Sequence, residues 1–151
     1  MASFGRGIAT RALAGRAMVA LALVAAGCAS LGRFDRANDF EDAQQRFSQL
    51  VRWGQISKAS EWVAPEQRAE FLTLAPEFTD VRFTDYEILD VKLADDARSA
   101  TAEVRYLGYL VPSYLERSVD LRQEWRCDDS AGWQVRLETA RIRSVLAGAT
   151  P

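Results

Sequence analysis

The sequence predicts an α+β domain in which three N-terminal helices pack on a curved, four-stranded antiparallel sheet, preceded by a cleaved signal helix. Apolar residues recur at helical spacing between Asn38 and Pro76, and after Pro76 the apolar period changes to two. The chain has 151 residues, and removing the first 27 leaves 124, a length suited to a single domain with one core. We therefore expect a signal peptide (1–27), a short tether (28–37) and one α+β domain (38–151).

The first segment has the features of a secretory signal peptide. A basic start is followed by an unbroken apolar run over residues 17–26. The basic residues are Arg6, Arg11 and Arg16. Because a membrane-spanning helix needs about 20 apolar residues, this run is too short to span and we expect it to be removed.

Ala26-Gly27-Cys28 resembles the lipobox of bacterial lipoproteins, although Ala25 stands where Leu or Val is usual. The resemblance implies that Cys28 becomes the first mature residue and carries the lipid, a palmitate-type anchor. It also implies outer-membrane sorting, because Ala29 replaces the Asp that often retains such proteins at the inner membrane. The alternatives are an ordinary signal cleaved near Ala26 and a core helix. A tether of about ten residues reaches only about 33–36 Å, so we expect the domain close to the bilayer.

The spacing predicts a first helix over Asn38–Trp53, with Asn38 and Glu41 as a capping-box-like start and Gly54 as its stop. Its apolar face is Phe40, Ala43, Phe47, Leu50 and Val51.

Two shorter helices are expected next. Ser57 would cap a helix over Ser57–Val63, with Ala59, Trp62 and Val63 on one side. Pro65 would begin a helix over Pro65–Ala75 that Pro76 ends. Its inward residues would be Ala69, Phe71 and Leu72.

A strand over Val81–Leu93 changes register near its middle, which indicates a bulge near Asp85. After a polar turn over Asp95–Ser99, a second strand shows alternating apolar residues. These are Ala102, Val104, Tyr106 and Leu110.

Leu115–Cys127 alternates most clearly, with an apolar face and a charged face expected to form cross-strand ion pairs in water. The apolar face is Leu115, Val119, Leu121, Trp125 and Cys127; the charged residues are Glu116, Asp120, Arg122, Glu124 and Arg126. Residues 128–132 turn the chain into a last strand with Trp133, Val135 and Leu137. Arg141–Pro151 either extends that strand or frays. All four tryptophans, including Trp53, occupy expected core positions.

Composition excludes several classes of function. The chain has no histidine, which excludes His-based triads and His zinc sites. After Cys28 there are 16 basic and 21 acidic residues, a net charge of −5 that disfavours nucleic acid. With Cys28 lipidated, Cys127 stands alone; it is either buried and inert or part of an intermolecular bridge, and we expect burial. We find no catalytic motif and expect no cofactor and no metal, since Asp95-Asp96 and Asp128-Asp129 read as turn residues.

The order of elements, and Ala59-Ser60-Glu61-Trp62-Val63 before Pro65-Glu66, resemble the cone-shaped nuclear transport factor two-like superfamily within the cystatin-like folds. The resemblance covers roughly residues 35–137. It implies a cone whose enzymatic members carry Asp, His or Tyr inside, while other members bind small molecules or proteins. Here the inward positions of the clearest strand are apolar except Arg117 and Gln123, so we expect no enzyme.

Residues 106–115 are unusual for a hairpin connection, which is normally polar. They carry three tyrosines, Tyr106, Tyr109 and Tyr114, around Gly108 and Pro112. Either both strands run longer and these residues close the core, or the tyrosines form a partner contact.

The sequence thus predicts a lipid-anchored, non-enzymatic envelope protein that faces the periplasm and binds or assembles with another envelope protein. Its membrane contact would be the lipid on Cys28. The alternative is a carrier of a small apolar ligand inside the cone.

Overall fold

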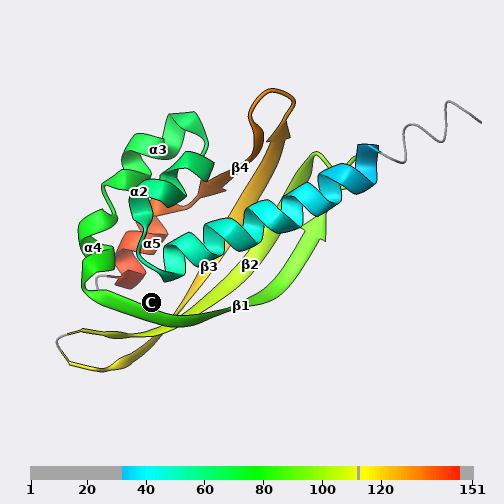
Figure 1. Ribbon diagram of the computed structural model, residues 1–151. Coiled ribbons are helices and arrows are strands. Elements are labelled where there is room, and N and C mark those ends of the chain that lie inside the picture. The colour runs from blue at the N-terminus through cyan, green and yellow to red at the C-terminus, as the bar shows by residue number, and fades with distance from the viewer. Residues whose placement is uncertain (1–31, 112, 147–151) are drawn as a thin grey trace, which may run out of the picture. The chain divides into compact units, whose positions relative to one another are not determined.

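The computed structural model describes residues 32–111 and 113–146 (Figure 1). The chain forms two units, Met1–Asp35 and Arg36–Pro151, and the second holds the fold. The predicted signal peptide and Cys28 lie outside the described residues. Among the helices that the structure describes, none combines the length and the apolar composition needed to cross a membrane.

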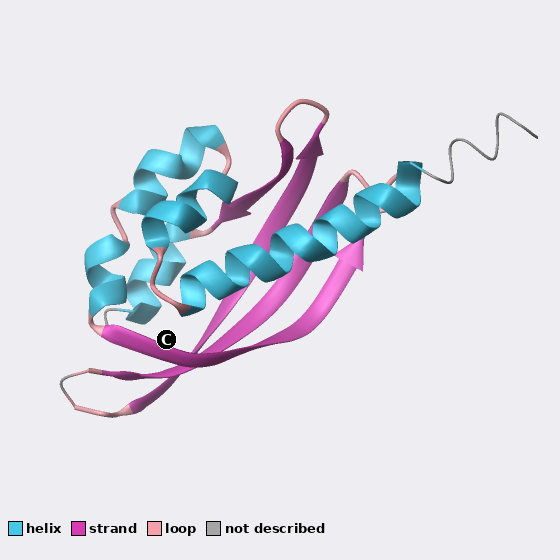
Figure 2. Cartoon of the chain, in the orientation of Figure 1, coloured by secondary structure: helices cyan, strands magenta, loops and turns pink. Residues whose placement is uncertain are grey.

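Four strands form one antiparallel sheet in the order β1-β2-β3-β4 (Figure 2). They are β1 (Val81–Leu93), β2 (Ser99–Leu110), β3 (Glu116–Asp128) and β4 (Gly132–Leu137). The predicted α+β class and sheet are confirmed. The bulge expected near Asp85 is present between Phe83 and Asp85, and a second register shift follows between Ile88 and Asp90.

The first helix covers residues 32–52, so the predicted start at Asn38 is wrong and Asn38 lies inside the helix. No proline or glycine interrupts residues 33–53, so the helix can begin earlier. Tertiary contacts also hold the helical turn at Arg36. The Trp133 Nε1–H donates to the Arg36 carbonyl (3.0 Å), and the Arg36 guanidinium donates to the Asp96 carbonyl (3.1 Å). Gly54 ends the helix as predicted, in a left-handed conformation (φ 66°).

Short helices follow instead of two longer ones. They are α2 (Ile56–Ala59), the 3-10 helix η1 (Ser60–Trp62), α3 (Pro65–Leu72) and α4 (Ala75–Thr79). The role predicted for Pro76 is wrong: it lies in the first turn of α4, where its missing N–H costs no helical hydrogen bond. Of the inward residues predicted for α3, only Phe71 is buried, whereas Ala69 and Leu72 are exposed.

The C-terminal prediction is wrong for residues 141–146, which belong to the helix α5 (Thr139–Leu146); residues 147–151 lie outside the described residues. Thr139, Ile142 and Leu146 are its buried residues, and their spacing of three and four places them on one helical face. This helical face packs against the hydrophobic core, so the chain after β4 does not extend the strand.

The core forms where the first helix crosses the inner face of the sheet. Phe40 and Phe47 each meet the indole of Trp125 edge to face, with ring centroids 5.9 and 5.8 Å apart. Trp125 and Trp133 are buried as predicted, but Trp53 is 63% exposed at the end of the helix, beneath the Arg52 guanidinium. Leu115 is 52% exposed rather than inward, because β3 begins one residue later.

The outer face of the sheet is charged and faces water. The Arg105 guanidinium donates to both carboxylate oxygens of Asp120 on the neighbouring strand (2.8 and 2.9 Å), and these hydrogen bonds lower the pKa of Asp120. Arg122 and Glu124 pair along β3 (3.5 Å). The cross-strand pairing expected for this face therefore holds for Asp120.

Gly108 generates a prediction about the sheet. A Cβ at this position would lie 2.3 Å from the Arg82 carbonyl oxygen on β1. Gly108→Ala should therefore separate β1 from β2 and lower the free energy of unfolding by about 1–3 kcal/mol, measured by chemical denaturation. Gly54→Ala is the matched control: nothing lies within 4 Å of its Cβ, so only its positive φ adds a cost, of about 1–2 kcal/mol. Unchanged stability in Gly108→Ala would contradict this steric account.

Candidate functional site

The inside of the cone holds a set of hydrogen-bonded side chains that we call the interior polar cluster. Its members are Gln44, Ser48, Tyr106, Gln123 and Trp125, all buried. The Gln123 amide nitrogen donates to Ser48 Oγ and Tyr106 Oη (3.4 Å each), and Trp125 Nε1 donates to Gln123 Oε1 (3.1 Å). The Gln44 amide donates to Ser48 Oγ (3.0 Å).

The sheet and the first helix both contribute residues to the interior polar cluster. Gln123 and Trp125 are alternate residues of β3, so both point to the inner face, and Tyr106 pairs with Val119 on the same face. Gln44 and Ser48 are one turn apart on the first helix. The inward position of Gln123 was predicted from the alternation of the strand. Gln44 and Ser48 were not predicted, although both lie on the helical face of Phe40, Phe47 and Val51.

The chemistry of this cluster is neutral. None of its five members is a carboxylate or an imidazole, and burial raises the pKa of Tyr106 well above its ordinary value. General acid–base catalysis requires a group that exchanges a proton near the working pH. The cluster therefore orders the core and supplies no such group.

The three predicted contact tyrosines are not brought together. Tyr106 is fully buried, which corrects its assignment to a contact surface. Tyr109 and Tyr114 stack with their ring centroids 5.6 Å apart, and Tyr114 is 76% exposed. Of the two interpretations, core closure applies to Tyr106, whereas the exposed part of the segment keeps the contact hypothesis.

Around these two rings lies an apolar area that we call the tip patch. It consists of Leu107, Tyr109, Val111, Tyr114 and Leu115, at the end of the β2–β3 hairpin. Leu107 and Tyr109 pair with Ser118 and Glu116, which places them on the outer face of the sheet. A shallow hollow of about 520 Å³ adjoins them. Tyr114 has a φ of 53°, an unfavourable conformation for an aromatic residue.

Cys127 and the predicted turn carboxylates form no metal site. The Cys127 thiol is partly exposed, rather than buried as expected, and desolvation raises its pKa. Within residues 32–111 and 113–146, no three acidic or cysteine side chains are grouped to hold a metal ion. Asp128 instead accepts hydrogen bonds from Ser130 and Ala131 in its own turn.

No family model matches the chain, and no curated protein matches it. Solved structures do. A ketosteroid isomerase-like protein from Erwinia carotovora atroseptica has a TM-score of 0.50 and 15% identity, over 63% of this chain and 86% of that protein. A SEC-C motif containing protein from Rhodopseudomonas palustris has a TM-score of 0.50 and 15% identity, over 60% of this chain and 70% of that one. At this identity the likeness concerns the fold. The domain therefore has the fold of ketosteroid isomerase-like, nuclear transport factor two-like proteins.

Proposed function

We propose that the chain is a non-enzymatic envelope lipoprotein, anchored through lipid on Cys28 at the outer membrane, whose domain binds another envelope protein. The observation that carries the proposal is the interior polar cluster, which occupies the inside of the cone with neutral, mutually bonded side chains. The partner protein would therefore bind at the surface of the domain.

The same packing bears on the alternative of an apolar ligand carried inside the cone. Tyr106, Gln123 and Trp125 are each 1% exposed or less and fill this space. A ligand there would displace Gln123 from its hydrogen bonds and leave the indole N–H of Trp125 without an acceptor. Each buried group that loses its hydrogen-bond partner costs about 1–3 kcal/mol. We therefore favour a protein partner.

The tip patch supports a partner contact. The rest of the outer face is rich in charged side chains, such as Arg105, Asp120 and Arg122, whereas the tip patch is apolar and aromatic. Tyrosines with an exposed ring and a polar tip are enriched in protein interfaces. A costly backbone conformation at Tyr114 also fits a functional position, because unfavourable φ/ψ values cluster at such sites.

The tip patch is well placed for a protein tethered by its N-terminus. The domain begins at Arg36, which contacts Asp96 in the β1–β2 turn, at the end of β2 opposite the tip. β2 has 12 residues, a length of about 40 Å at about 3.4 Å per residue. Arg36, the first residue of the domain, and the tip patch therefore lie at opposite ends of β2.

The interior polar cluster generates a stability prediction. Gln123→Leu should lower the free energy of unfolding by about 1–3 kcal/mol, because the Trp125 N–H and the Tyr106 hydroxyl lose their bonded partner. Chemical denaturation measures this change. Gln134→Leu, on the outer side of β4, is the control and should change stability by no more than about 0.5 kcal/mol. Equal stability of the two variants would show that the interior cluster is not a structural element.

The anchor is tested on protein purified from its own host. Intact mass spectrometry should find residues 1–27 removed and acyl chains on Cys28. Cys28→Ser should lose the lipid and leave the membrane fraction, since attachment depends on acyl chains. A retained Met1, or an unmodified thiol at the new N-terminus, would contradict the lipoprotein assignment.

The tip patch is tested by replacing both stacked rings. Tyr109→Ser combined with Tyr114→Ser should abolish recovery of an envelope protein that the parent chain recovers in stoichiometric amount, while the thermal midpoint shifts only slightly. Leu89→Ser, on β1 and as exposed as Leu107, is the control and should retain the partner. A collapsed midpoint in the double variant would assign Tyr109 and Tyr114 to core closure, and full partner recovery would exclude the tip patch as the contact.

A further inference from the structure

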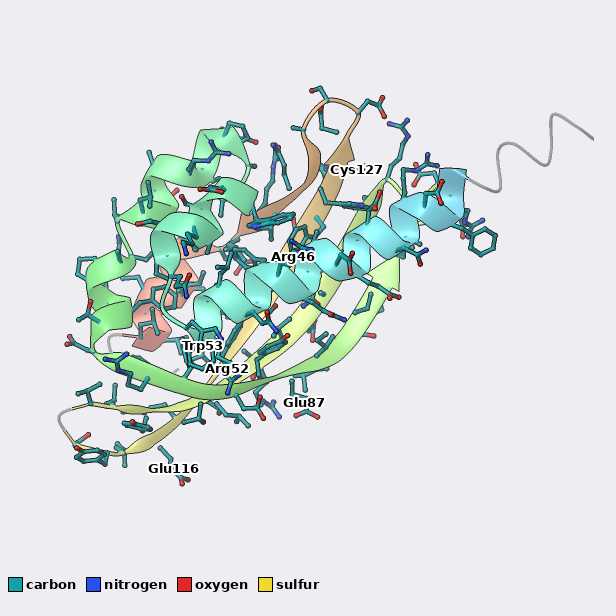
Figure 3. The ribbon with its side chains drawn as sticks, viewed as in Figure 1. Arg46, Arg52, Trp53, Glu87, Glu116 and Cys127 are labelled. Atoms are coloured by element: carbon teal, nitrogen blue, oxygen red, sulfur yellow. The ribbon has the colours of Figure 1, made fainter. Side chains whose placement is uncertain are left out.

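A groove runs along the side of the first helix, away from the tip patch. It consists of two adjoining hollows of about 320 and 310 Å³, and Arg46 and Trp62 line both. Figure 3 labels Arg46 on the first helix, Trp53 at the end of that helix and Cys127 on β3; Cys127 lines the second hollow. We call the two hollows together the helix groove.

One half of the helix groove has three large apolar side chains, although Gln49 and Gln55 also line it. Leu50 and Trp53 follow Arg46 on one face of the helix, at intervals of four and three residues, and Trp62 of η1 lines the same hollow. The Arg52 guanidinium lies 4.9 Å from the centre of the Trp53 ring, a cation–π contact that helps to hold the exposed indole. Two indoles and a leucine thus face a hollow within the size range of small-molecule sites.

Arg46 supplies a positive charge in the middle of the helix groove. Among the described residues, its guanidinium has no ion pair within 4.0 Å and no hydrogen bond, although Asp42 is one turn away. Arg105 and Arg136, by contrast, pair with Asp120 and Glu66. A guanidinium presents five N–H donors in a fixed fork that fits carboxylate and similar anions. Arg46 therefore keeps its donors available to a ligand.

The other half of the helix groove carries two carboxylates, Asp39 and Asp42, beside apolar residues that include Trp62 and Trp133. These carboxylates repel a second negative charge near Arg46 and favour a ligand with only one. The rest of that ligand fits the half lined by Leu50, Trp53 and Trp62, because no carboxylate lines that half. The charges and the apolar wall together define one ligand class.

We propose that the helix groove binds a small, free organic monoanion. Its flat or aliphatic apolar part lies against Trp53 and Trp62, and its single carboxylate or sulfonate pairs with Arg46. This site is separate from the tip patch and from the interior polar cluster, and it does not depend on the function proposed above.

Two probes of nearly the same shape test the proposal: 1-naphthaleneacetate, a monoanion, and its neutral analogue 1-naphthaleneacetamide. Isothermal titration calorimetry on the purified full chain should show the anion binding about ten-fold more tightly, because only the anion forms a charge-assisted pair with Arg46. This preference should shrink as salt is added, since Arg46 is exposed to solvent.

Variants separate the contribution of the Arg46 charge from that of the Trp62 indole. Arg46→Gln should remove the ten-fold preference and leave binding of the neutral probe unchanged, whereas Trp62→Ala should weaken both probes. Arg122→Gln, in a hollow of about 250 Å³ on the outer face, is the matched control and should alter neither. Thermal midpoints of the arginine variants should equal that of the parent chain, because both arginines are exposed.

Several results would overturn the proposal. These are failure of both probes to bind at millimolar concentration, equal affinity for the two probes in the parent chain, and a preference for the anion that survives Arg46→Gln. Equal loss in Arg122→Gln would also overturn it, because anion binding would then reflect surface charge in general. Vesicles containing phosphatidylglycerol should not displace the anion, and displacement would assign the site to lipid headgroups instead.

Discussion

The contact of Phe40 and Phe47 with the Trp125 indole holds the first helix on the sheet, and the other sites depend on it. It fixes the rotation of the helix, since the two rings are two turns apart on one side. With that side facing the sheet, Gln44 and Ser48 point to the interior, and Arg46, Leu50 and Trp53 face the helix groove. This aromatic contact thus determines which residues of the first helix are buried against the sheet and which are exposed in the helix groove.

The buried polar residues form a neutral network that contains no carboxylate and no imidazole. Tyr106 has a hydroxyl inside the fold, but its partners are an amide and a serine, so no charged base acts on it. Burying neutral, mutually bonded groups costs little once each has a partner. The features on which the two binding proposals rest lie outside this network: the stacked Tyr109 and Tyr114 at the hairpin tip, and Arg46 with Trp53 and Trp62 in the helix groove.

Much of the fold could be predicted from local patterns. The bounds of β1, the bulge near Asp85, the stop at Gly54 and the inward position of Gln123 all follow from residue spacing or turn chemistry. The predicted helix start was wrong, because residues 33–37 contain no proline or glycine to stop the helix before Asn38. The assignment of Pro76 failed because proline suits a first turn as well as a termination.

The sequence by itself determined the α+β class, the alternation of the strands and the absence of histidine chemistry, since each depends on residue identity or on a short-range period. Only the tertiary structure decided which tyrosines are exposed, because Tyr106 and Tyr109 differ in the face of β2 from which they project and in what covers that face. It also decided that Trp53 is exposed beside Arg46 and Trp62, a neighbourhood that joins elements separated by a turn. Burial depends on contacts between distant segments, and no local pattern contains them.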